Sequence, residues 1–438
     1  MRFIPYALPQ FAIAFVTLAL INFTPSFYAT EVGLDLGLLS LLILATRFSD
    51  VLTDPLIGWL SDRSAAPWGR RKGFMVAGVP VLVTGAWFLF HPPGGAGAVY
   101  FLVWYAVVFF GLTLIQLPFN AWGAEMSSDY DTRTRIASVR EAVGATGSIA
   151  AIGILIVLAM RGDTALGSAL HVAAIVLCVA TPLTVLVSLR APATLDAVRP
   201  ALTQVTTKAR SVLRNRPFLL LLAGVFFIYM GITPGGAMAF FVYDTLMGRP
   251  DLFGINLLVQ FVTAAIGIGF WSRLAQRIPK GRAVAAVLLW FGGLTAFMPI
   301  LAELFGAWGV VGTAAVRSLA LGAILALPYS IFADAVDIDT LRSGRERTGA
   351  HVGVAGVVIK LALTVGIALS FAVPDLFGFD PNSATNTDAA LFSVAAVWSF
   401  LPGLLWLPAI AIFWNFPITR EDAARTRAAI EAQAYANT

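Results

Sequence analysis

The chain has 438 residues, of which 58% are hydrophobic and only 12% charged, and its mean hydropathy is +0.83. Soluble globular proteins carry roughly 25% charged residues, so this composition excludes an ordinary polar surface and indicates an integral membrane protein. The single cysteine, Cys178, excludes a disulfide within the chain and a metal site built from several cysteines.

Apolar runs long enough to cross about 30 Å of hydrocarbon as a helix, roughly 20 residues each, occur twelve times between polar breaks. The first run lacks a small-residue cleavage site and has the length of a spanning helix, so we expect it to be retained rather than removed as a signal peptide. The twelve predicted helices cover residues 6–29, 37–61, 73–91, 98–123, 137–160, 168–190, 217–243, 251–275, 281–303, 307–333, 351–374 and 389–415.

Basic residues are distributed unevenly among the loops between these helices. The outer loops contain only Arg161 and Arg249, whereas most of the 29 Lys and Arg lie at the N-terminus, in the loops after even-numbered helices and in the tail. Because cytoplasmic loops carry such an excess, we expect both termini in the cytoplasm and the protein in a plasma membrane, the inner membrane of a bacterium. This topology also accounts for the net charge of +5, and no nucleic-acid partner is expected.

The second predicted helix carries charge inside an apolar segment. Asp50 and Asp54 are one turn apart and Arg47 precedes Asp50 by three residues, so all three lie on one helix face. Carboxylates are costly inside a bilayer and mark functional sites there. Such a pair can hold Na⁺ with other oxygen atoms, among them the hydroxyl of Thr53, or can exchange a proton. The alternative is an Arg47–Asp50 ion pair that only joins helices, which leaves Asp54 unexplained.

The loop after the second helix combines an acid with clustered bases. Such charges can pair with neighbouring helix ends while the inner side is closed and separate when it opens. The alternative is that these basic residues only set the topology. The predicted cytoplasmic gate consists of Asp62, Arg63, Arg70 and Arg71, with Glu125, Asp334, Asp337 and Arg342 as candidate partners.

A long polar segment and a repeated motif divide the chain into halves. The tripeptide LPF at residues 117–119 recurs as LPY at residues 327–329, and an acid-rich, then Arg-rich loop follows each copy. Two six-helix halves repeated in parallel describe the major facilitator architecture, in which substrate and ion sites lie near the midplane. We therefore predict an all-α membrane protein with bundles at residues 1–190 and 217–416, a cytoplasmic linker at 191–216 and a tail at 417–438.

The second half contains two further candidates. The run TPGG at residues 233–236 predicts a break in the seventh helix, and Tyr243 beyond it is a candidate substrate contact. Lys360 lies deep in the apolar run of the eleventh helix and needs an anionic partner. With Asp50 and Asp54 it would give a charge-balanced arrangement in which an arriving cation competes with the lysine. The alternative is a purely structural ion pair between helices.

Four motifs follow one another in order along nearly the whole chain: DxxxDPxxGxxSDR at 50–63, WGRR at 68–71, LPF with the tail DYDTRTR, and ADAVDIDTLRSGRER before Lys360. Together they resemble the glycoside-pentoside-hexuronide:cation symporters, the melibiose permease family of the major facilitator superfamily. The resemblance implies a secondary active transporter that carries a small organic solute together with Na⁺ or H⁺ by alternating access. It implies neither an enzyme nor a cofactor besides the coupling ion, and we expect a monomer in the lipid bilayer.

The resemblance also assigns roles to individual residues. The residues implied to bind the coupling cation, with the two acids as ligands of Na⁺ if coupling is to sodium, are Asp50, Asp54, Thr53 and Thr113. Arg140 and Lys360 look like the basic residues that line the family's substrate pocket. Arg47 and Lys360 are the expected coupling charges.

The sugar half of the pattern departs from the family. Where the melibiose permease has acids on its first and fourth helices and a tryptophan one turn later, this chain has Gln10, Gln116 and Asn120. Amides still bond to sugar hydroxyls, while fewer acids beside Arg140 make the pocket more positive and suit a uronate. The expected substrate is therefore a sugar, a glycoside or a uronate, contacted by Gln10, Gln116, Asn120, Arg140, Lys360 and Tyr243.

Two alternatives stay open at this point. The sodium-dependent lysophosphatidylcholine symporters share the cation motif, so a lysophospholipid-like or other amphiphilic substrate is one alternative. The other is a sensor or assembly partner that keeps the fold without transport, although such a protein has no need of buried charges that oppose membrane insertion. A primary pump is not expected, because the sequence has no GxxxxGK[ST] nucleotide-binding motif.

Overall fold

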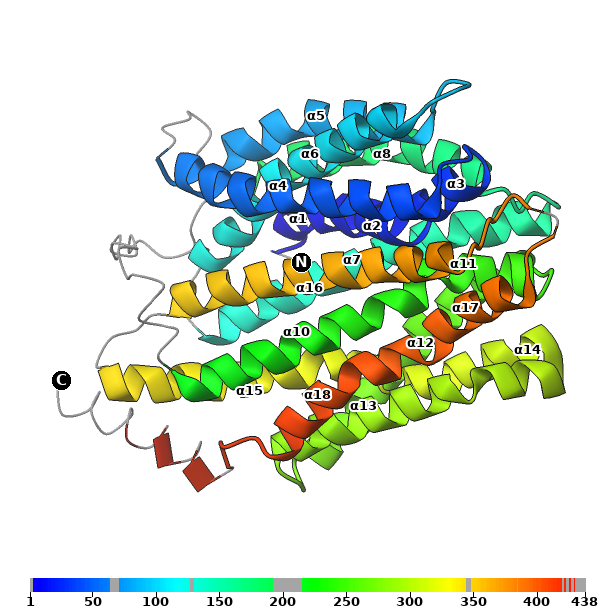
Figure 1. Ribbon diagram of the computed structural model, residues 1–438. Helices are drawn as coiled ribbons and strands as arrows, with labels where there is room; N and C mark the ends of the chain where they lie inside the picture. Colours follow the sequence, from blue (N-terminus) through cyan, green and yellow to red (C-terminus); the bar gives the residue numbers. More distant parts are fainter. Residues whose placement is uncertain are drawn as a thin grey trace. The chain divides into compact units, whose positions relative to one another are not determined.

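The computed structural model describes residues 3–63, 71–126, 130–191, 215–343, 348–383 and 385–419, together with residues 421–422, 425–426 and 429. Across these residues the regular elements are all helical (Figure 1). Eleven of the described segments, some of them several helices joined end to end, are long and apolar enough to span a membrane. The predicted all-α class is confirmed.

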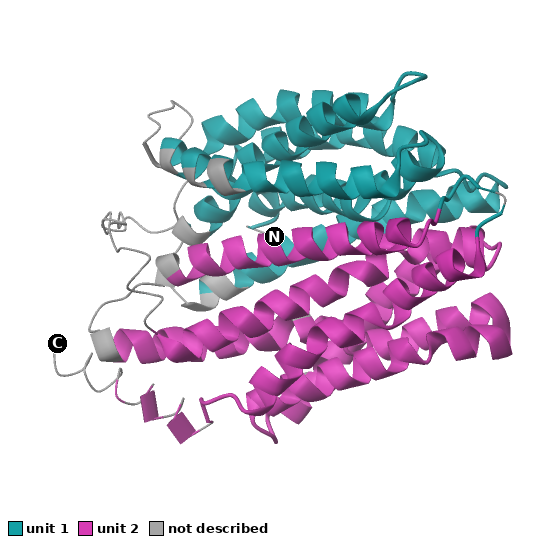
Figure 2. Cartoon of the chain, viewed as in Figure 1, with its two compact units in different colours: residues 1–201, 380–386 teal, residues 202–379, 387–438 magenta. Residues whose placement is uncertain are grey.

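The chain forms two compact units, drawn in different colours in Figure 2. The first comprises residues 1–201 and 380–386. Its first predicted span consists of three consecutive pieces, each with a proline in its first turn, because proline has no N–H to continue a preceding turn. The helices of this unit are α1 (Ile4–Ala7), α2 (Pro9–Asn22), α3 (Thr24–Thr30), α4 (Leu36–Arg63), α5 (Lys72–Phe90), α6 (Ala98–Glu125), α7 (Tyr130–Met160) and α8 (Leu166–Ser188).

The second unit comprises residues 202–379 and 387–438. Its core lies among α10, α13, α15 and α18, where buried side chains such as Phe218, Leu288 and Trp406 pack together. The described helices of this unit are α10 (Arg216–Ala237), α11 (Ala239–Phe241), the π-helix η1 (Val242–Leu246), α12 (Asp251–Ala275), α13 (Lys280–Ala296), α14 (Met298–Ser318), α15 (Leu321–Ser343), α16 (Thr348–Leu376), α17 (Asp388–Ser399) and α18 (Leu401–Trp414).

Helix α14 contains a turn at Gly306. Its φ of 62° and ψ of −162° lie in a region of backbone space that is essentially restricted to glycine. The residues before this turn belong to the predicted ninth span, which begins with α13, and those after it belong to the tenth, which continues into α15. With this division, each of the twelve predicted spans corresponds to helical structure, and the twelve-helix prediction is confirmed.

The predicted break at residues 233–236 is wrong, because α10 continues through them to Ala237. Pro234 has no N–H to donate to the carbonyl of Met230 one turn earlier. The hydroxyl of Thr233 donates to that carbonyl instead, at 2.9 Å, and so supplies the missing hydrogen bond. The irregular backbone lies further along, in the short α11 and the π-helix η1.

Glycines allow close contact between helices of the first unit. Helix α5 packs along α6, where a Cβ atom on Gly111 would lie 2.5 Å from the backbone nitrogen of Leu82. Helix α2 packs along α7, where a Cβ atom on Gly147 would lie 2.2 Å from the carbonyl oxygen of Phe11. Both spaces are bounded by backbone, which cannot move aside as a flexible side chain can.

The Gly147→Ala variant should therefore unfold at a lower temperature than the wild-type protein. Forcing extra atoms into a packed interior costs about 1–3 kcal/mol, and thermal unfolding in detergent measures the loss. The matched control is Gly153→Ala on the same helix, where an added Cβ meets nothing within 4 Å. That variant should be neutral or slightly stabilising, because alanine favours a helix over glycine by about 1 kcal/mol. Equal effects of the two substitutions would contradict this explanation of the packing.

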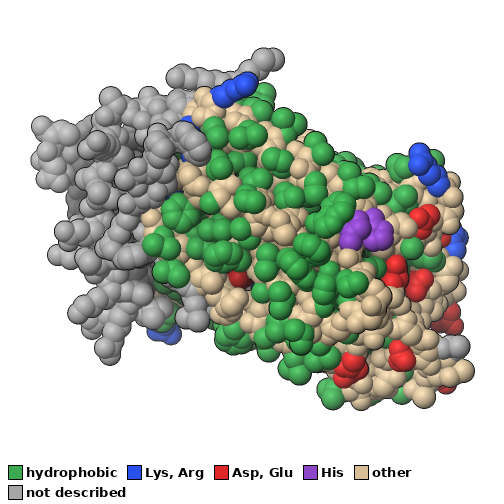
Figure 3. Space-filling view, turned by 90° about the horizontal axis from the view of Figure 1, so that it is seen from above, with side chains coloured by type: hydrophobic (Ala, Val, Ile, Leu, Met, Phe, Trp, Pro, Cys, Tyr) green, Lys and Arg blue, Asp and Glu red, His purple; other side chains and the backbone are tan. Residues whose placement is uncertain are grey.

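Large apolar side chains remain exposed along the helices, as expected for surfaces that face lipid. On α8, Val179, Leu183 and Leu186 are 62%, 58% and 58% exposed, and their spacing of four and three residues places them on one face. The space-filling view in Figure 3 shows hydrophobic side chains covering much of one face of the molecule, with Asp and Glu gathered toward one end.

Candidate functional site

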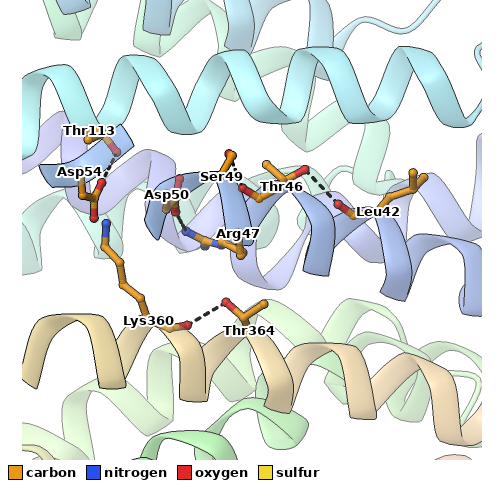
Figure 4. Close-up of polar contacts among 9 residues, drawn as sticks. All are labelled: Leu42, Thr46, Arg47, Ser49, Asp50, Asp54, Thr113, Lys360 and Thr364. Atoms are coloured by element: carbon orange, nitrogen blue, oxygen red, sulfur yellow. Dashed lines mark hydrogen bonds and ion pairs between the residues drawn. The ribbon is translucent and has the colours of Figure 1, made fainter. Parts of the chain in front are cut away.

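The two acids of α4 form different polar contacts (Figure 4). Asp50 is 3% exposed, and its Oδ2 atom lies 3.3 Å from Nη1 of Arg47, one turn earlier on the same helix. Asp54 is half-buried, and its Oδ1 atom accepts a hydrogen bond of 3.3 Å from the hydroxyl of Thr113. Thr113 belongs to α6, which packs against α4. The structure thus brings together Arg47 and Asp50, as their spacing predicts, and also Asp54 and Thr113, as the family resemblance implies.

Aromatic residues of α6 enclose the charged part of this cluster. The guanidinium carbon of Arg47 lies 3.5 Å from the ring centroid of Phe109, a cation–π contact. Tyr105, one turn earlier, is fully buried and within electrostatic range of Arg47 and Asp50, and its hydroxyl has no hydrogen-bond partner among the described residues. The sequence analysis missed Tyr105, although the spacing of Phe101, Tyr105 and Phe109 places three rings on one face of α6.

The donor set of this cluster suits a hard monovalent cation. Carboxylate and hydroxyl oxygens are the ligands that hard cations prefer, and Asp50, Asp54 and Thr113 supply them from two packed helices. The side chain of Thr53 is half-buried beside Asp54 on α4. A cation that takes Asp50 as a ligand must displace Arg47 from it. The described residues contain no group of three or more His, Cys, Asp or Glu that could hold a metal ion.

Four predicted substrate residues belong to the first unit, and two of them are in contact. Nη1 of Arg140 on α7 donates to Oδ1 of Asn120 on α6 at 3.1 Å. Gln10 on α2 lies against Gly144, one turn after Arg140, where a Cβ atom would be 2.9 Å from the Gln10 Cγ. Gln116 precedes Asn120 by one turn and is half-buried. These side chains combine amide groups with a guanidinium group, a set that both donates and accepts hydrogen bonds.

The expected excess of positive charge beside Arg140 needs a correction. Nε and Nη2 of Arg140 lie 3.1 Å and 2.9 Å from Oε1 of Glu141, so the adjacent residue supplies the opposite charge. Neighbouring residues on a helix point in different directions, so their spacing does not predict this ion pair. The long arginine side chain bends back and overcomes this separation. Glu141 therefore offsets the positive charge of Arg140 that would favour a uronate.

Two predicted residues belong to the second unit. Lys360 lies on α16 with a half-buried side chain, and its carbonyl oxygen accepts a hydrogen bond of 2.7 Å from Thr364 (Figure 4). Its coupling role stays a prediction. Tyr243 lies in η1 and is fully buried, and its contact with substrate stays a prediction.

The predicted gate residues form contacts within each unit. Nη1 of Arg71 donates to the hydroxyl of Ser61 at 2.7 Å, which connects the two ends of the loop after α4. In the second unit, Asp334 is buried and forms an ion pair with Lys280, a residue that the sequence analysis missed. Asp337 is half-buried. The side chains of Asp62, Arg63, Glu125 and Arg342, and all of Arg70, lie outside the described residues.

Comparisons with known proteins place this geometry in context. The family described as "MFS/sugar transport protein", where MFS denotes the major facilitator superfamily, matches residues 5–420. The chain is 23% identical to the Inner membrane symporter YicJ of Escherichia coli, over 87% of this chain and 84% of the relative. It is 24% identical to the Putative glycoside/cation symporter YagG of Escherichia coli, over 92% and 88%.

A third relative has a different kind of substrate in its name. The Sodium-dependent lysophosphatidylcholine symporter 1 of Xenopus tropicalis is 22% identical over 98% of this chain and 87% of the relative. Among solved structures, a D-xylose-proton symporter matches with a TM-score of 0.67 and 14% identity, over 96% of this chain and 98% of that chain. At this identity the structural match shows the fold alone.

Proposed function

Because the chain belongs to the MFS/sugar transport protein family, we propose that it is a symporter, which couples the transport of a small organic solute to the entry of Na⁺ or H⁺. Transport proceeds by alternating access, with the inward cation gradient as the source of free energy. Both termini lie in the cytoplasm and the protein resides in the plasma membrane, a proposal supported by the scarcity of basic residues in the predicted outer loops.

The observation that carries this proposal is the pair of acids on α4. Asp50 forms an ion pair with Arg47, and Asp54 accepts a hydrogen bond from Thr113. A cation bound by both carboxylates releases Arg47 from Asp50, so binding changes the charge contacts of α4 and favours one conformation over another. A proton on Asp54 also lowers the negative charge of the pair, while Asp50 keeps its charge and its ion pair with Arg47.

The proposed substrate is a sugar, a glycoside or a uronate, bound in the first unit by Gln10, Gln116, Asn120 and Arg140. The hydrogen bond between Arg140 and Asn120 supports this assignment, because it fixes the direction of both side chains before a solute arrives. Preorganised polar groups bind sugar hydroxyls with less loss of conformational entropy than mobile ones do.

An amphiphile is a second candidate, favoured by a cavity of about 130 Å³ in the second unit. Most of its lining is apolar, contributed by residues of α10, α15 and α16 such as Leu222, Phe332 and Ile359. A hydrocarbon chain fits such a lining better than a sugar does, because burial of polar hydroxyls without partners is unfavourable. The relative named as a lysophosphatidylcholine symporter supports the same candidate.

Sodium should raise the unfolding temperature of the purified protein if Na⁺ is the coupling ion. A ligand that binds only the folded state stabilises it by about 2.7 kcal/mol at a concentration 100 times its Kd. The titration replaces potassium gluconate by sodium gluconate at fixed pH and ionic strength. A shift with Na⁺ identifies sodium, whereas equal unfolding temperatures in both salts would contradict sodium coupling and leave protons as the coupling ion.

The same assay distinguishes the two substrate classes. In saturating Na⁺, or at low pH if protons couple, glucuronate and xylose should stabilise the protein if it carries sugars. Lysophosphatidylcholine, added below its critical micelle concentration, should stabilise it if the apolar cavity holds an acyl chain. The Asp54→Asn variant serves as the control, because a solute response that depends on the coupling ion should be lost in it.

A further inference from the structure

The second unit buries an arginine that the proposed transport mechanism does not use. Arg317 follows the turn at Gly306 in α14 and is 1% exposed. Its guanidinium donates to two neutral oxygens, Oγ1 of Thr295 and Oε1 of Gln260, each at 3.2 Å. Among the described residues no acid forms an ion pair with it. Burying a charge without an opposite charge costs several kcal/mol in order-of-magnitude terms.

Aromatic rings surround the same guanidinium. Its central carbon lies 4.8 Å from the ring centroid of Phe291 and 5.7 Å from that of Trp398. Cation–π contacts stabilise the positive charge by about 2 kcal/mol when they are desolvated. They do not supply a hydrogen-bond acceptor for the Nε–H group of Arg317, which has no partner among the described residues. The charge is therefore only partly compensated.

Other buried polar atoms near Arg317 lack partners as well. The Nε atom of Arg317, the hydroxyl of Tyr243, and both the Nδ2 and the Oδ1 atoms of Asn256 have no hydrogen-bond partner among the described residues. Tyr243 and Asn256 are fully buried, and Tyr243 is within electrostatic range of Arg317. Asn256 precedes Gln260 by one turn on α12, so both face the same side. Three of these four atoms can donate a hydrogen bond, and buried donors without acceptors are rare.

A cavity of about 380 Å³ approaches this cluster. Its lining includes Gly306 and Glu303 at the turn of α14, and Trp398 and Ser399 at the end of α17. Trp398 therefore lines the cavity and also contacts the guanidinium of Arg317. The hydroxyl of Ser399 is buried and has no hydrogen-bond partner among the described residues. The remaining lining is mostly apolar, and the carboxylate of Glu303 in this lining is exposed.

We propose that Arg317, together with Tyr243 and Asn256, forms a binding site for a small monovalent anion inside the second unit, reached through the cavity beside Trp398. One anion accepts hydrogen bonds from several donors at once and neutralises the guanidinium. It therefore removes the cost of the unpartnered donors together with the cost of the buried positive charge. Chloride and the carboxylate of a small acid share this chemistry. The site is separate from the Asp50 and Asp54 cluster, and this inference does not rest on symport.

The test is the unfolding temperature of the purified full-length protein at constant Na⁺ and ionic strength. Sodium gluconate is replaced stepwise by sodium chloride, and in a second arm by sodium acetate. We expect the unfolding temperature to rise by a few degrees for each tenfold increase in chloride above its Kd. A response to acetate but not to chloride would assign the site to a carboxylate. No response to either anion would overturn the proposal.

Substitutions separate anion binding from a purely structural role of Arg317. In Arg317→Gln the chloride response should disappear, while stability in gluconate should equal or exceed that of wild type, since the unpaired buried charge is gone. Equal destabilisation in both salts would overturn the proposal. If this variant does not fold, Tyr243→Phe removes one donor only, and it should weaken chloride binding by roughly tenfold.

The matched control is Arg249→Gln in the same unit. Arg249 is exposed and already forms an ion pair of 2.7 Å with Asp251. Its replacement should leave the chloride response unchanged. A chloride response that is lost in Arg249→Gln but kept in Arg317→Gln would place the anion elsewhere and overturn the assignment.

Discussion

Replacing Asp54 by asparagine should abolish accumulation of solute against its gradient while leaving the fold intact. The amide oxygen of asparagine can still accept the hydrogen bond from Thr113, so the contact between α4 and α6 is preserved. Opposite charges about 4 Å apart attract by roughly 4 kcal/mol at an effective dielectric constant of about 20. Loss of the Asp54 charge should therefore weaken cation binding by about three powers of ten.

Uptake into proteoliposomes with an imposed cation gradient measures this effect. The matched control is Asp35→Asn, the same substitution just before the start of α4, where Asp35 accepts a hydrogen bond from the N–H of Leu38. Asparagine and aspartate serve equally well at such a position, so this variant should accumulate solute normally. An Asp54→Asn protein that still accumulates solute to the wild-type level would remove Asp54 from the coupling mechanism, whether the ion is Na⁺ or H⁺.

The Arg140→Gln variant should bind the transported solute roughly 10- to 150-fold more weakly, since hydrogen bonds to charged groups contribute about 1.5–3 kcal/mol each. The substitution also removes the contact that orients Asn120. Solute binding in saturating cation, measured by calorimetry, gives the loss directly. Cation binding should be unaffected, because the hydrogen bonds of Arg140 are with Asn120 and Glu141.

The control for Arg140 is Arg161→Gln, an exposed arginine just beyond the end of the same helix. Unchanged solute affinity in Arg140→Gln, or an equal loss in Arg161→Gln, would exclude the proposed substrate contact. Glu141→Gln adds a test of substrate charge, because it removes the acid that pairs with Arg140. A uronate should then bind more tightly, whereas the affinity of a neutral sugar should change little.

Features set by local spacing could be predicted from the sequence. Hydropathy located all twelve spans, because the length of an apolar run directly reflects the thickness of the bilayer. The pairing of Arg47 with Asp50 followed from a separation of three residues on one helix. The contact between Asp54 and Thr113 joins two helices, and it was reached only through the resemblance to a known family.

Features that depend on compensation by neighbouring groups could not be predicted. A proline followed by two glycines indicates a helix break, yet the hydroxyl of Thr233 replaces the missing hydrogen bond and α10 continues. The charge of Arg140 is balanced by Glu141, a partner that helix geometry alone does not suggest. The surroundings of Arg317 could not be predicted from local spacing, because they come from four different helices.

The central claim is that a cation gradient drives solute uptake through the acids of α4. The most direct measurement is the steady-state solute concentration inside proteoliposomes, using a solute identified by the stability assay, under an inward gradient of Na⁺ or of H⁺. The account predicts an internal concentration above the external one, which returns to equality when an ionophore collapses the gradient of the coupling ion. Equal internal and external concentrations under both gradients, with transport otherwise intact, would contradict it.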